Sequence, residues 1–475
     1  MTRKTAFILF GFLLPFVVLA DFDPETSVVE IEVTKKSYDY RTPWVVRNEQ
    51  VSKNGIVIGP NQILTTADGL SGQYLSRIKK GGISRQYTAD LQWVDYYANV
   101  AIFDVADEEF WQGMEPVELS RTIPQGGELQ IYRWRGGRIE ERAAEIIRLF
   151  SGQSKTSYIR HLILTASSPI ESAGWAEIVV DGDDLVGLTA SASKDTLAIL
   201  PAGFIAMVLE RREASADFRL GYFDFKSMSA NNPALLASKG LDLRDVGVVV
   251  TEVGGRGLSS DDLQPGDVIL EIDGFEIDSE GTYLDPEYGR LSMSGLATRR
   301  HVAGEVLPFR IWREGRERMI DYTLPGADFD KELIPEQRYD AAAQYLVAGG
   351  FVFQPLNGPL MNALGKNRPP LLDYYRRQTG ADSRAGFVVL SGVLPDDFNL
   401  GYEDLRYLLV DKINGQPIND LADIEAALKR PEGGFHRIQF MQEERVQHVV
   451  LNARDMEGAT MRILKNYRIP ARSQL

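Results

Sequence analysis

The chain has 475 residues, of which 44% are hydrophobic and 25% are charged, and 52 Lys and Arg against 67 Asp and Glu give a net charge of −15. This composition is that of a globular protein of about three domains, at ~100 to 200 residues each, and its acidity disfavours nucleic acid or an anionic membrane surface as the main partner. The absence of cysteine excludes disulfides, a thiolate metal site and a lipoprotein anchor, and the four histidines lack zinc-site spacing, so we expect neither a metal nor a cofactor.

The N-terminus has the pattern of a secretory signal peptide. Arg3 and Lys4 precede an apolar run over residues 6–20, which is short for a bilayer span of about 20 residues. Small or branched residues at 18–20 suit a signal peptidase, so residues 1–20 are predicted to be removed and the mature chain to be exported to the periplasm or cell envelope. The alternative is an uncleaved anchor. No later segment is expected to span a membrane.

Short strands separated by Gly, Pro, Asn and Asp turns follow, which indicates a mainly β domain over residues 21–213. The expected strands are 28–33, 55–58, 62–67, 89–94, 99–105 and 128–134, followed by 178–180 and 185–188. The run 202–213 has helical spacing and is predicted to close this domain.

Two later segments, 263–277 and 405–418, resemble each other. Each has an apolar strand, a turn at Asp273-Gly274 or Asn414-Gly415, and a second short strand, which is a strong hairpin signal. The repeat favours two copies of one α+β module, at 214–326 and 385–475. A connecting segment, 327–384, is expected between them, with a helix over 339–348 and a strand over 349–356.

Three motifs in order resemble the HtrA/Deg family of serine proteases. NGIVIGPNQILTTADGL (54–70) is similar to the segment that carries that family's catalytic histidine, ADLQWVDYYANVAIFDV (89–105) to the aspartate segment, and PIESAGWAEIVVDGDDLVGL (169–188) to the nucleophile loop. The two repeats resemble PDZ domains, with a divergent second copy as in plant and fungal enzymes. The resemblance implies a trypsin-like double β-barrel followed by two PDZ-like domains, and a homo-oligomer.

Carried over by this resemblance, the triad is degenerate. Asp68 stands at the histidine position, Asn99 at the aspartate position, and Ser172 at the nucleophile position. An aspartate with a reference pKa of about 3.9 is a far weaker general base than an imidazole near 6.5. Asn99 carries no charge with which to stabilise an imidazolium.

No other base is evident in the sequence of this domain. His161, the domain's one histidine, is interpreted as a structural or surface residue. A Ser–Lys dyad is an alternative, but Lys79, Lys80, Lys155, Lys194 and the other lysines lie in polar contexts without signs of burial. The nucleophile loop also carries Ile170 where the family has glycine, and β-branched residues tolerate positive φ poorly.

The first PDZ-like repeat is therefore the main candidate for ligand binding. PDZ domains add a peptide as a strand and hold its carboxylate with backbone N–H groups. The family's carboxylate loop resembles Arg219-Leu220-Gly221-Tyr222-Phe223, although these residues are also compatible with the first strand of the module. The second repeat shows no such loop and is expected to pack against other domains.

Two functions remain open from the sequence. The first is a non-catalytic, exported HtrA/Deg-like pseudoprotease that binds unfolded chains or C-terminal peptides as a chaperone or scaffold. The second is a serine endopeptidase of the same family with weak or unconventional activity through Ser172.

Overall fold

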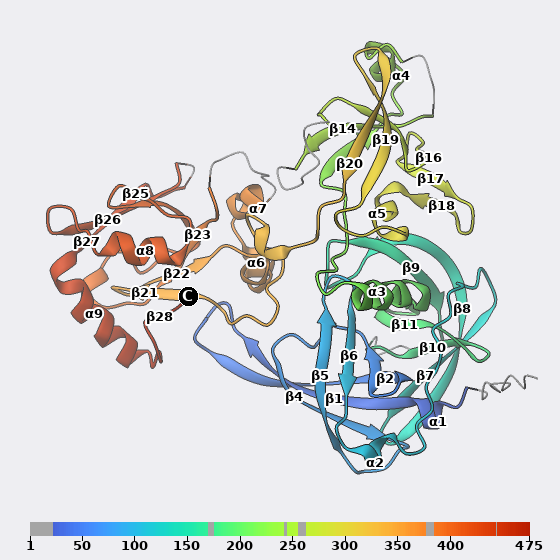
Figure 1. Ribbon diagram of the computed structural model, residues 1–475. Helices are drawn as coiled ribbons and strands as arrows, with labels where there is room; N and C mark the ends of the chain where they lie inside the picture. Colours follow the sequence, from blue (N-terminus) through green and yellow to red (C-terminus); the bar gives the residue numbers. More distant parts are fainter. Residues whose placement is uncertain (1–21, 170–174, 242–244, 255–262, 377–383, 443) are drawn as a thin grey trace, which may run out of the picture.

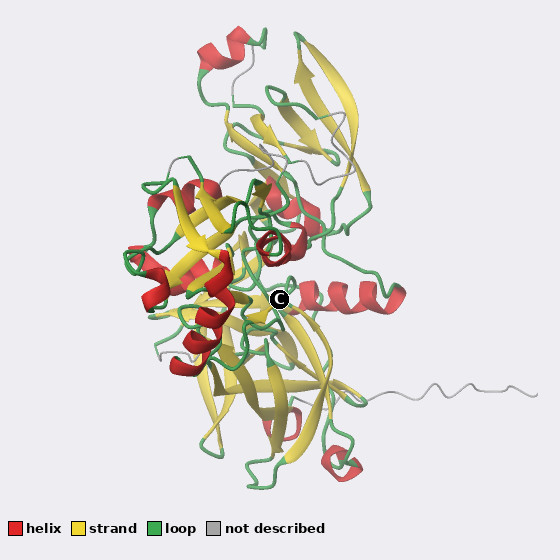
Figure 2. Ribbon diagram, turned by 90° about the vertical axis from the view of Figure 1, so that its left-hand side faces the viewer, coloured by secondary structure: helices red, strands yellow, loops and turns green. Residues whose placement is uncertain are grey.

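The computed structural model describes residues 22–169, 175–241, 245–254, 263–376, 384–442 and 444–475, in which strands dominate (Figure 2). The expected signal peptide and Ser172 lie outside the described residues. Within these ranges, no helix has both the length and the apolar character needed to cross a membrane.

The first part of the chain closes into a β-barrel. Its strands are β1 (Val28–Tyr38), β2 (Val46–Gly59), β3 (Gln62–Thr65), β4 (Gln73–Lys80), β5 (Tyr87–Asp95) and β6 (Val100–Asp104), in the order β1-β2-β3-β6-β5-β4. Two short helices, α1 (Pro24–Ser27) and α2 (Glu108–Trp111), flank it. Branched and aromatic residues of alternating strand positions fill the barrel, among them Ile31, Ile63, Ile78 and Phe103.

A second closed barrel follows, so the predicted trypsin-like double β-barrel is confirmed. It consists of β7 (Glu128–Arg135), β8 (Arg138–Gln153), β9 (Arg160–Ser167), β10 (Ile178–Asp181), β11 (Asp184–Ser193) and β12 (Thr196–Pro201), in the order β10-β11-β12-β9-β8-β7. The predicted closing helix is α3 (Ala202–Ala214). Its Phe204, Ile205 and Val208 pack into the core shared by both barrels.

The middle module, expected over residues 214–326, is built on a six-stranded sheet, and β17 and β18 pair in a separate two-stranded sheet. Its elements are β13 (Phe225–Ser229), α4 (Pro233–Ser238), β14 (Val248–Val253), β15 (Val268–Ile272), β16 (Phe275–Glu276), β17 (Thr282–Asp285), β18 (Gly289–Ser292), α5 (Leu296–Arg299), β19 (Val306–Arg313) and β20 (Arg316–Thr323). Asp273 and Gly274 have φ values of 51° and 81°, as a type I′ hairpin turn requires. The sheet order β13-β14-β15-β19-β20 leaves β13 at one edge.

The C-terminal module starts earlier than expected. Its elements are β21 (Tyr345–Ala348), β22 (Phe351–Pro355), α6 (Gly358–Leu364), α7 (Pro370–Arg376), β23 (Val388–Val393), β24 (Leu408–Ile413), β25 (Gln416–Pro417), α8 (Leu421–Leu428), β26 (Phe435–Phe440), β27 (His448–Asn452), α9 (Ala453–Asn466) and β28 (Ser473–Gln474). The helix expected over 339–348 is wrong, because Gly349 and Gly350 adopt positive φ and fold 345–355 into a hairpin. The expected connecting segment therefore supplies two strands that join β23 in one sheet.

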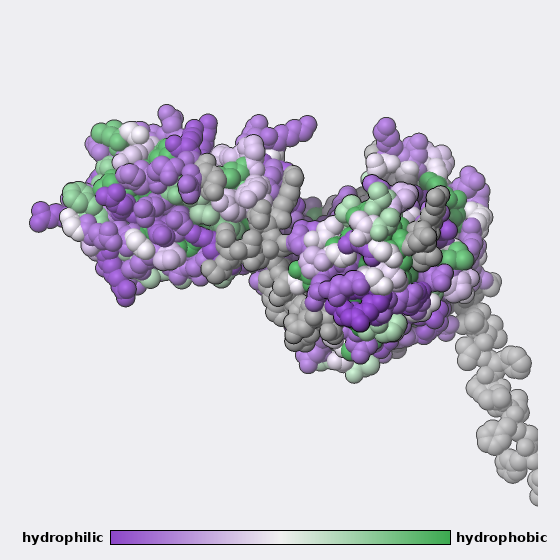
Figure 3. Space-filling view, turned by 90° about the horizontal axis from the view of Figure 1, so that it is seen from above, coloured by the Kyte–Doolittle hydropathy of each residue, from purple (hydrophilic) through white to green (hydrophobic). Residues whose placement is uncertain are grey.

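A long β1–β2 hairpin reaches from the first barrel to the C-terminal module (Figure 1). Near its tip, Arg41 Nε donates a 2.9 Å hydrogen bond to Ala363 O, and the Trp44 ring lies 5.8 Å from the Tyr345 ring, edge to face. Seen from above, the molecule shows two lobes whose visible surface is mostly hydrophilic (Figure 3). The hairpin therefore forms a direct contact between the first barrel and the C-terminal lobe.

Candidate functional site

Two of the three expected triad positions lie side by side. Asp68 follows β3 and Asn99 precedes β6, and these strands are neighbours in the first barrel. The backbone N–H of Asp68 donates a 2.8 Å hydrogen bond to Oδ1 of Asn99. Asn99 is 1% exposed and has a φ of 57°, a conformation that asparagine tolerates better than most residues. The side chain of Asn99, at the expected aspartate position, thus accepts a hydrogen bond from the backbone of Asp68.

Lys53, which the sequence analysis did not single out, is buried beside this pair. Its ammonium group donates to Thr66 O at 2.5 Å, to Asp68 O at 2.5 Å and to Thr66 Oγ1 at 3.0 Å. Desolvation lowers the pKa of Lys53 to about 7, against an opposing pull from the Asp68 carboxylate. No local sequence pattern marks Lys53 as buried, although residues 53–57 are all buried in β2.

Trp175, the first described residue after the nucleophile loop, packs on the same site. Lys53 Nζ lies 6.0 Å from the centroid of the Trp175 ring, and the backbone N–H of Asn54 donates to Trp175 O at 3.2 Å. A Cβ at Gly69 would come within 2.8 Å of the indole. The bulky Trp175 side chain therefore packs against the loop after Asp68. Ser172 itself lies outside the described residues.

Behind this loop, Glu177 is a fully buried carboxylate that two buried arginines neutralise. Arg133 Nη1 donates to Glu177 Oε1 at 2.9 Å, and Arg142 donates to Glu177 Oε2. Arg133 also bonds Glu140, whose side chain is partly exposed. Buried charges of this kind require paired and hydrogen-bonded partners. The ion pairs of Glu177 with Arg133 and Arg142 therefore join β7, β8 and the segment leading into β10.

His161 is a packing residue. Its ring stacks on Phe204 at 4.5 Å with an interplanar angle of 14°, and Nδ1 donates to Leu162 O at 2.8 Å. Burial lowers the pKa of His161 to about 4, which keeps the imidazole neutral. These contacts agree with the structural role expected from the sequence.

A groove lies at the free edge of the middle module. It has a volume of about 340 Å³ and is lined by β13, the residues before it, the end of β14, Met293 and Ser294. Tyr158 and Arg160 of the second barrel also contribute to its wall. Its size falls in the range of ligand sites, and the edge of β13 offers unpaired backbone groups for an added strand.

The loop of residues 219–223 precedes this edge strand, since β13 begins at Phe225. Gly221 forms an isolated antiparallel bridge with Gly326, and Tyr222 N–H donates to Pro325 O at 3.3 Å. Arg219 pairs with Asp328 at 3.2 Å, while Leu220 is buried and Phe223 packs in the module's core. The five residues expected to bind peptide thus lie outside β13, and Tyr222 and Phe223 of this loop line the groove.

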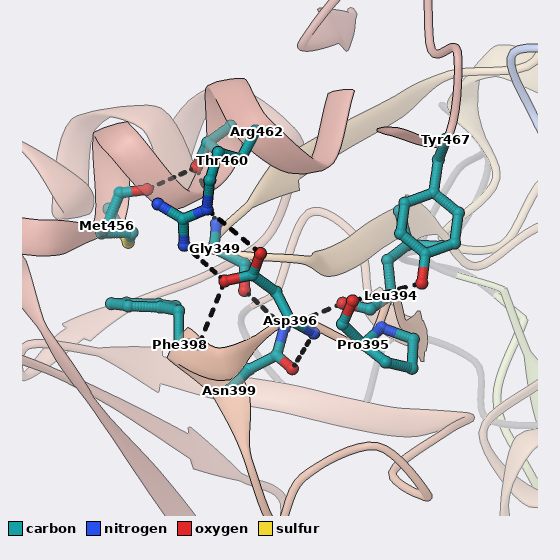
Figure 4. A network of polar contacts seen from close by, with 10 residues as sticks. All are labelled: Gly349, Leu394, Pro395, Asp396, Phe398, Asn399, Met456, Thr460, Arg462 and Tyr467. Carbon is teal, nitrogen blue, oxygen red and sulfur yellow. Dashed lines mark hydrogen bonds and ion pairs between the residues drawn. The ribbon is translucent and has the colours of Figure 1, made fainter. Parts of the chain in front are cut away.

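A glycine turn of the C-terminal module, Gly349-Gly350, is held by hydrogen bonds from within that module (Figure 4). Thr460 Oγ1 accepts a 2.8 Å hydrogen bond from Gly349 N–H, and Asn399 Nδ2 donates to Gly349 O at 2.9 Å. Arg462 pairs with Asp396 at 2.6 Å beside it. The following strand β22 is paired on both sides, by β21 and β23, so a peptide strand has no edge to join there.

Comparisons with known proteins agree with this architecture. The family model of the PDZ domain matches residues 334–474. Protease Do-like 2, chloroplastic, of Arabidopsis thaliana is 25% identical over 470 residues, which cover 94% of this chain and 74% of the relative. Protease Do-like 4, mitochondrial, of the same plant is 24% identical over 466 residues, covering 94% and 85%. The solved HtrA-type protease AlgW with a tripeptide aligns at a TM-score of 0.49 and 17% identity, over 64% of this chain and 95% of that chain.

Two closed barrels and a C-terminal PDZ domain define a trypsin-like fold with a PDZ domain. Over most of its length the chain is a homologue of the Do-like proteases of the HtrA family.

Proposed function

We propose that this chain is an exported, non-catalytic HtrA/Deg-like protein that captures unfolded or C-terminal peptide segments and acts as a chaperone or scaffold. Its binding site is the groove at β13 together with the 219–223 loop. The periplasm or cell envelope is the proposed location, and a homo-oligomer is the proposed state. The observation that carries the proposal is the Asp68–Asn99 pair, in which neither side chain supplies the base that a serine nucleophile needs.

The groove has features that suit an extended peptide. The free edge of β13 provides main-chain hydrogen bonds, and the half-buried Phe223 and Phe225 with the buried Met293 provide apolar contacts for alternate side chains. Arg160 at the wall is a cation that a terminal carboxylate can approach. An unfolded chain or a free C-terminus is the ligand that combines these features.

The test is capture of a peptide by the full mature chain. A fluorescein-labelled decapeptide with a C-terminal leucine carboxylate should bind, and the same peptide as a C-terminal amide should bind at least tenfold more weakly. At Gly254, on the groove wall, an added Cβ would come within 2.0 Å of Asp224 Oδ1. Gly254→Val should therefore disturb the groove and bind the carboxylate and amide peptides with equal, weak affinity. Equal binding of carboxylate and amide by the wild type would refute the proposed mode.

One observation favours the second candidate, a serine endopeptidase that works through Ser172. Lys53 is a buried amine beside Asp68 and Trp175, and burial lowers its pKa to about 7, where a neutral amine is populated. Lysine bases of this kind serve in Ser–Lys dyads. Against this, the ammonium has an acceptor for each of its three protons, two carbonyl oxygens and one hydroxyl, which is the pattern of a structural cation.

Labelling with a fluorophosphonate probe separates the two candidates. The non-catalytic proposal expects no label on the wild type and no digestion of an unfolded protein. If the wild type labels and digests while Ser172→Ala and Lys53→Met do neither, the endopeptidase with a lysine base is established instead. Lys155→Met, which alters an exposed lysine between β8 and β9 of the second barrel, is the matched control and should behave as the wild type.

A further inference from the structure

The segment between the middle and C-terminal modules is held by many specific contacts along its length. We call residues 325–340 the strap. It leaves the middle module after β20 and runs past the barrels toward β21 (Figure 1). Over most of this stretch the chain forms neither helix nor long strand, yet its backbone and side chains are bonded to three different parts of the protein.

At its first end the strap is bonded to the 219–223 loop. Tyr222 N–H donates to Pro325 O at 3.3 Å, and Ala327 N–H donates to Leu220 O at 3.0 Å. The Arg219–Asp328 ion pair follows directly. The strap therefore already uses one of the backbone N–H groups with which a PDZ loop would hold a peptide carboxylate.

In its middle the strap lies on both barrels. Phe329 N–H donates to the Tyr97 hydroxyl of the first barrel, and the two rings stack at 4.5 Å. Asp328 N–H donates to the Tyr158 hydroxyl of the second barrel at 3.3 Å, and the Tyr158 ring meets Phe329 edge to face at 5.1 Å. One short stretch of chain thus bridges the two barrels.

At its far end the strap covers the surface next to Asp68. The Tyr339 ring stacks on Tyr96 at 3.9 Å, and its hydroxyl donates to Thr156 O of the second barrel at 2.6 Å. Burial raises the pKa of Tyr339, and the charge of Asp68 raises it further.

Asp340 completes this attachment. Its carboxylate accepts hydrogen bonds from the Tyr96 hydroxyl at 2.9 Å and from Gly72 N–H at 2.9 Å, and its own N–H donates to Ser71 Oγ at 2.9 Å. Ser71 and Gly72 lie in the turn that directly follows the turn containing Asp68. The strap therefore occupies the barrel surface next to Asp68, and a ligand that bound there would have to displace it.

We propose that the strap couples the two surfaces: capture of a peptide carboxylate at the 219–223 loop displaces Pro325 O from Tyr222 N–H and loosens the strap from the barrel surface beside Asp68. The inference rests on the proposed function of the groove. The strap holds the barrel surface closed in the unliganded chain, and a bound peptide competes with its first anchor. Weakening the far anchor must then favour peptide binding, because binding and release are linked.

The experiment measures peptide affinity and hydrogen exchange on the full mature chain, with the carboxylate decapeptide as the probe. Tyr339→Phe removes only the hydroxyl that bonds Thr156, and Tyr339→Ala also removes the stacking on Tyr96. We expect the peptide to bind about threefold and about tenfold more tightly, respectively, and saturating peptide to speed amide exchange in residues 326–344 of the wild type. Tyr374→Ala, an exposed tyrosine of α7, is the control and should leave both measurements unchanged.

Two results would overturn the coupling, and they are distinguishable. If the wild type binds the peptide but exchange in 326–344 and the affinities of both Tyr339 variants stay at wild-type values, the groove functions and the strap is merely structural. If neither the wild type nor any variant binds the peptide, the proposed function fails and the coupling with it. Tyr339→Phe retains the aromatic packing, so a folding defect of the alanine variant leaves the test intact.

Discussion

The backbone N–H of Asp68 and the side-chain oxygen of Asn99 are joined by a 2.8 Å hydrogen bond inside the first barrel. In a serine protease triad the corresponding carboxylate orients an imidazole ring. Here the amide oxygen orients backbone instead, and Lys53 bonds the carbonyl of the same residue. Asp68 and Asn99, which the sequence resemblance predicts at the positions of the catalytic base and its partner, are thus joined to each other and to Lys53 by hydrogen bonds.

Replacing Asn99 by alanine should cost about 1 to 3 kcal/mol of unfolding free energy. The buried N–H of Asp68 would lose its acceptor, and alanine would be strained at a φ of 57°. Asn99→Asp retains the acceptor and a residue that tolerates this conformation but adds a buried carboxyl group beside Asp68, so it should lose less than the alanine variant once that carboxyl is protonated, at about pH 4. Chemical denaturation of the three proteins measures the difference; equal losses in both variants would show that the hydrogen bond is unimportant.

Lys53 should make the stability of the protein depend on pH in a defined window. The folded chain releases the proton near pH 7, whereas the unfolded chain keeps it to about pH 10.4. Between these values the unfolded state binds more protons, so the free energy of unfolding rises with pH. Relative to Lys53→Met, the wild type should gain about 3 kcal/mol from pH 7 to 9.5.

Thermal and chemical unfolding at several pH values test this sign. Lys155→Met, which alters an exposed side chain, corrects for other groups that titrate in the same range. A constant difference between the wild type and Lys53→Met across the window would mean that the three hydrogen bonds hold Lys53 charged throughout.

The sequence predicted those features that rest on local patterns. The hairpins at Asp273-Gly274 and Asn414-Gly415 and the helix α3 are found where turn residues and apolar periodicity placed them. The triad positions Asp68 and Asn99 are adjacent in space because the order of their strands in the barrel brings them together.

The features that the sequence did not predict depend on distant contacts. Burial of Lys53 requires hydrogen-bond acceptors from Thr66 and Asp68. The sequence of β2 itself does not indicate that these acceptors lie beside it. The strand β21 was expected as helix because its alanine-rich surroundings favour one, yet pairing with β22 and β28 decides its conformation. The strap combines partners from three modules, which no local pattern encodes.

His161 should make the protein sensitive to acid. The folded chain holds the imidazole neutral down to about pH 4, while the unfolded chain takes up a proton near pH 6.5. The unfolded state therefore binds more protons between these values, and stability falls as the pH drops through this window. At pH 5 the loss should be about 2 kcal/mol in the wild type.

His161→Phe preserves the stacking on Phe204 and should remove this part of the acid sensitivity. Unfolding free energies at pH 7.5 and pH 5 measure it, with His448→Gln, an exposed histidine of β27, as the matched control. If His161→Phe loses as much stability on acidification as the wild type, the imidazole is not the group responsible.

Glu177 should be among the most sensitive single positions of the barrels. Truncation to alanine would leave Arg133 and Arg142 buried without their shared carboxylate, and breaking a buried ion pair from one side typically costs about 3 to 5 kcal/mol. Glu140 bonds the same Arg133 from a partly exposed position, so Glu140→Ala should cost less than about 1 kcal/mol. Denaturation midpoints of the two variants provide the comparison. Similar losses in both would mean that water reaches the arginines when Glu177 is removed, and a triple replacement by apolar residues that restores stability would show that the network serves specificity more than stability.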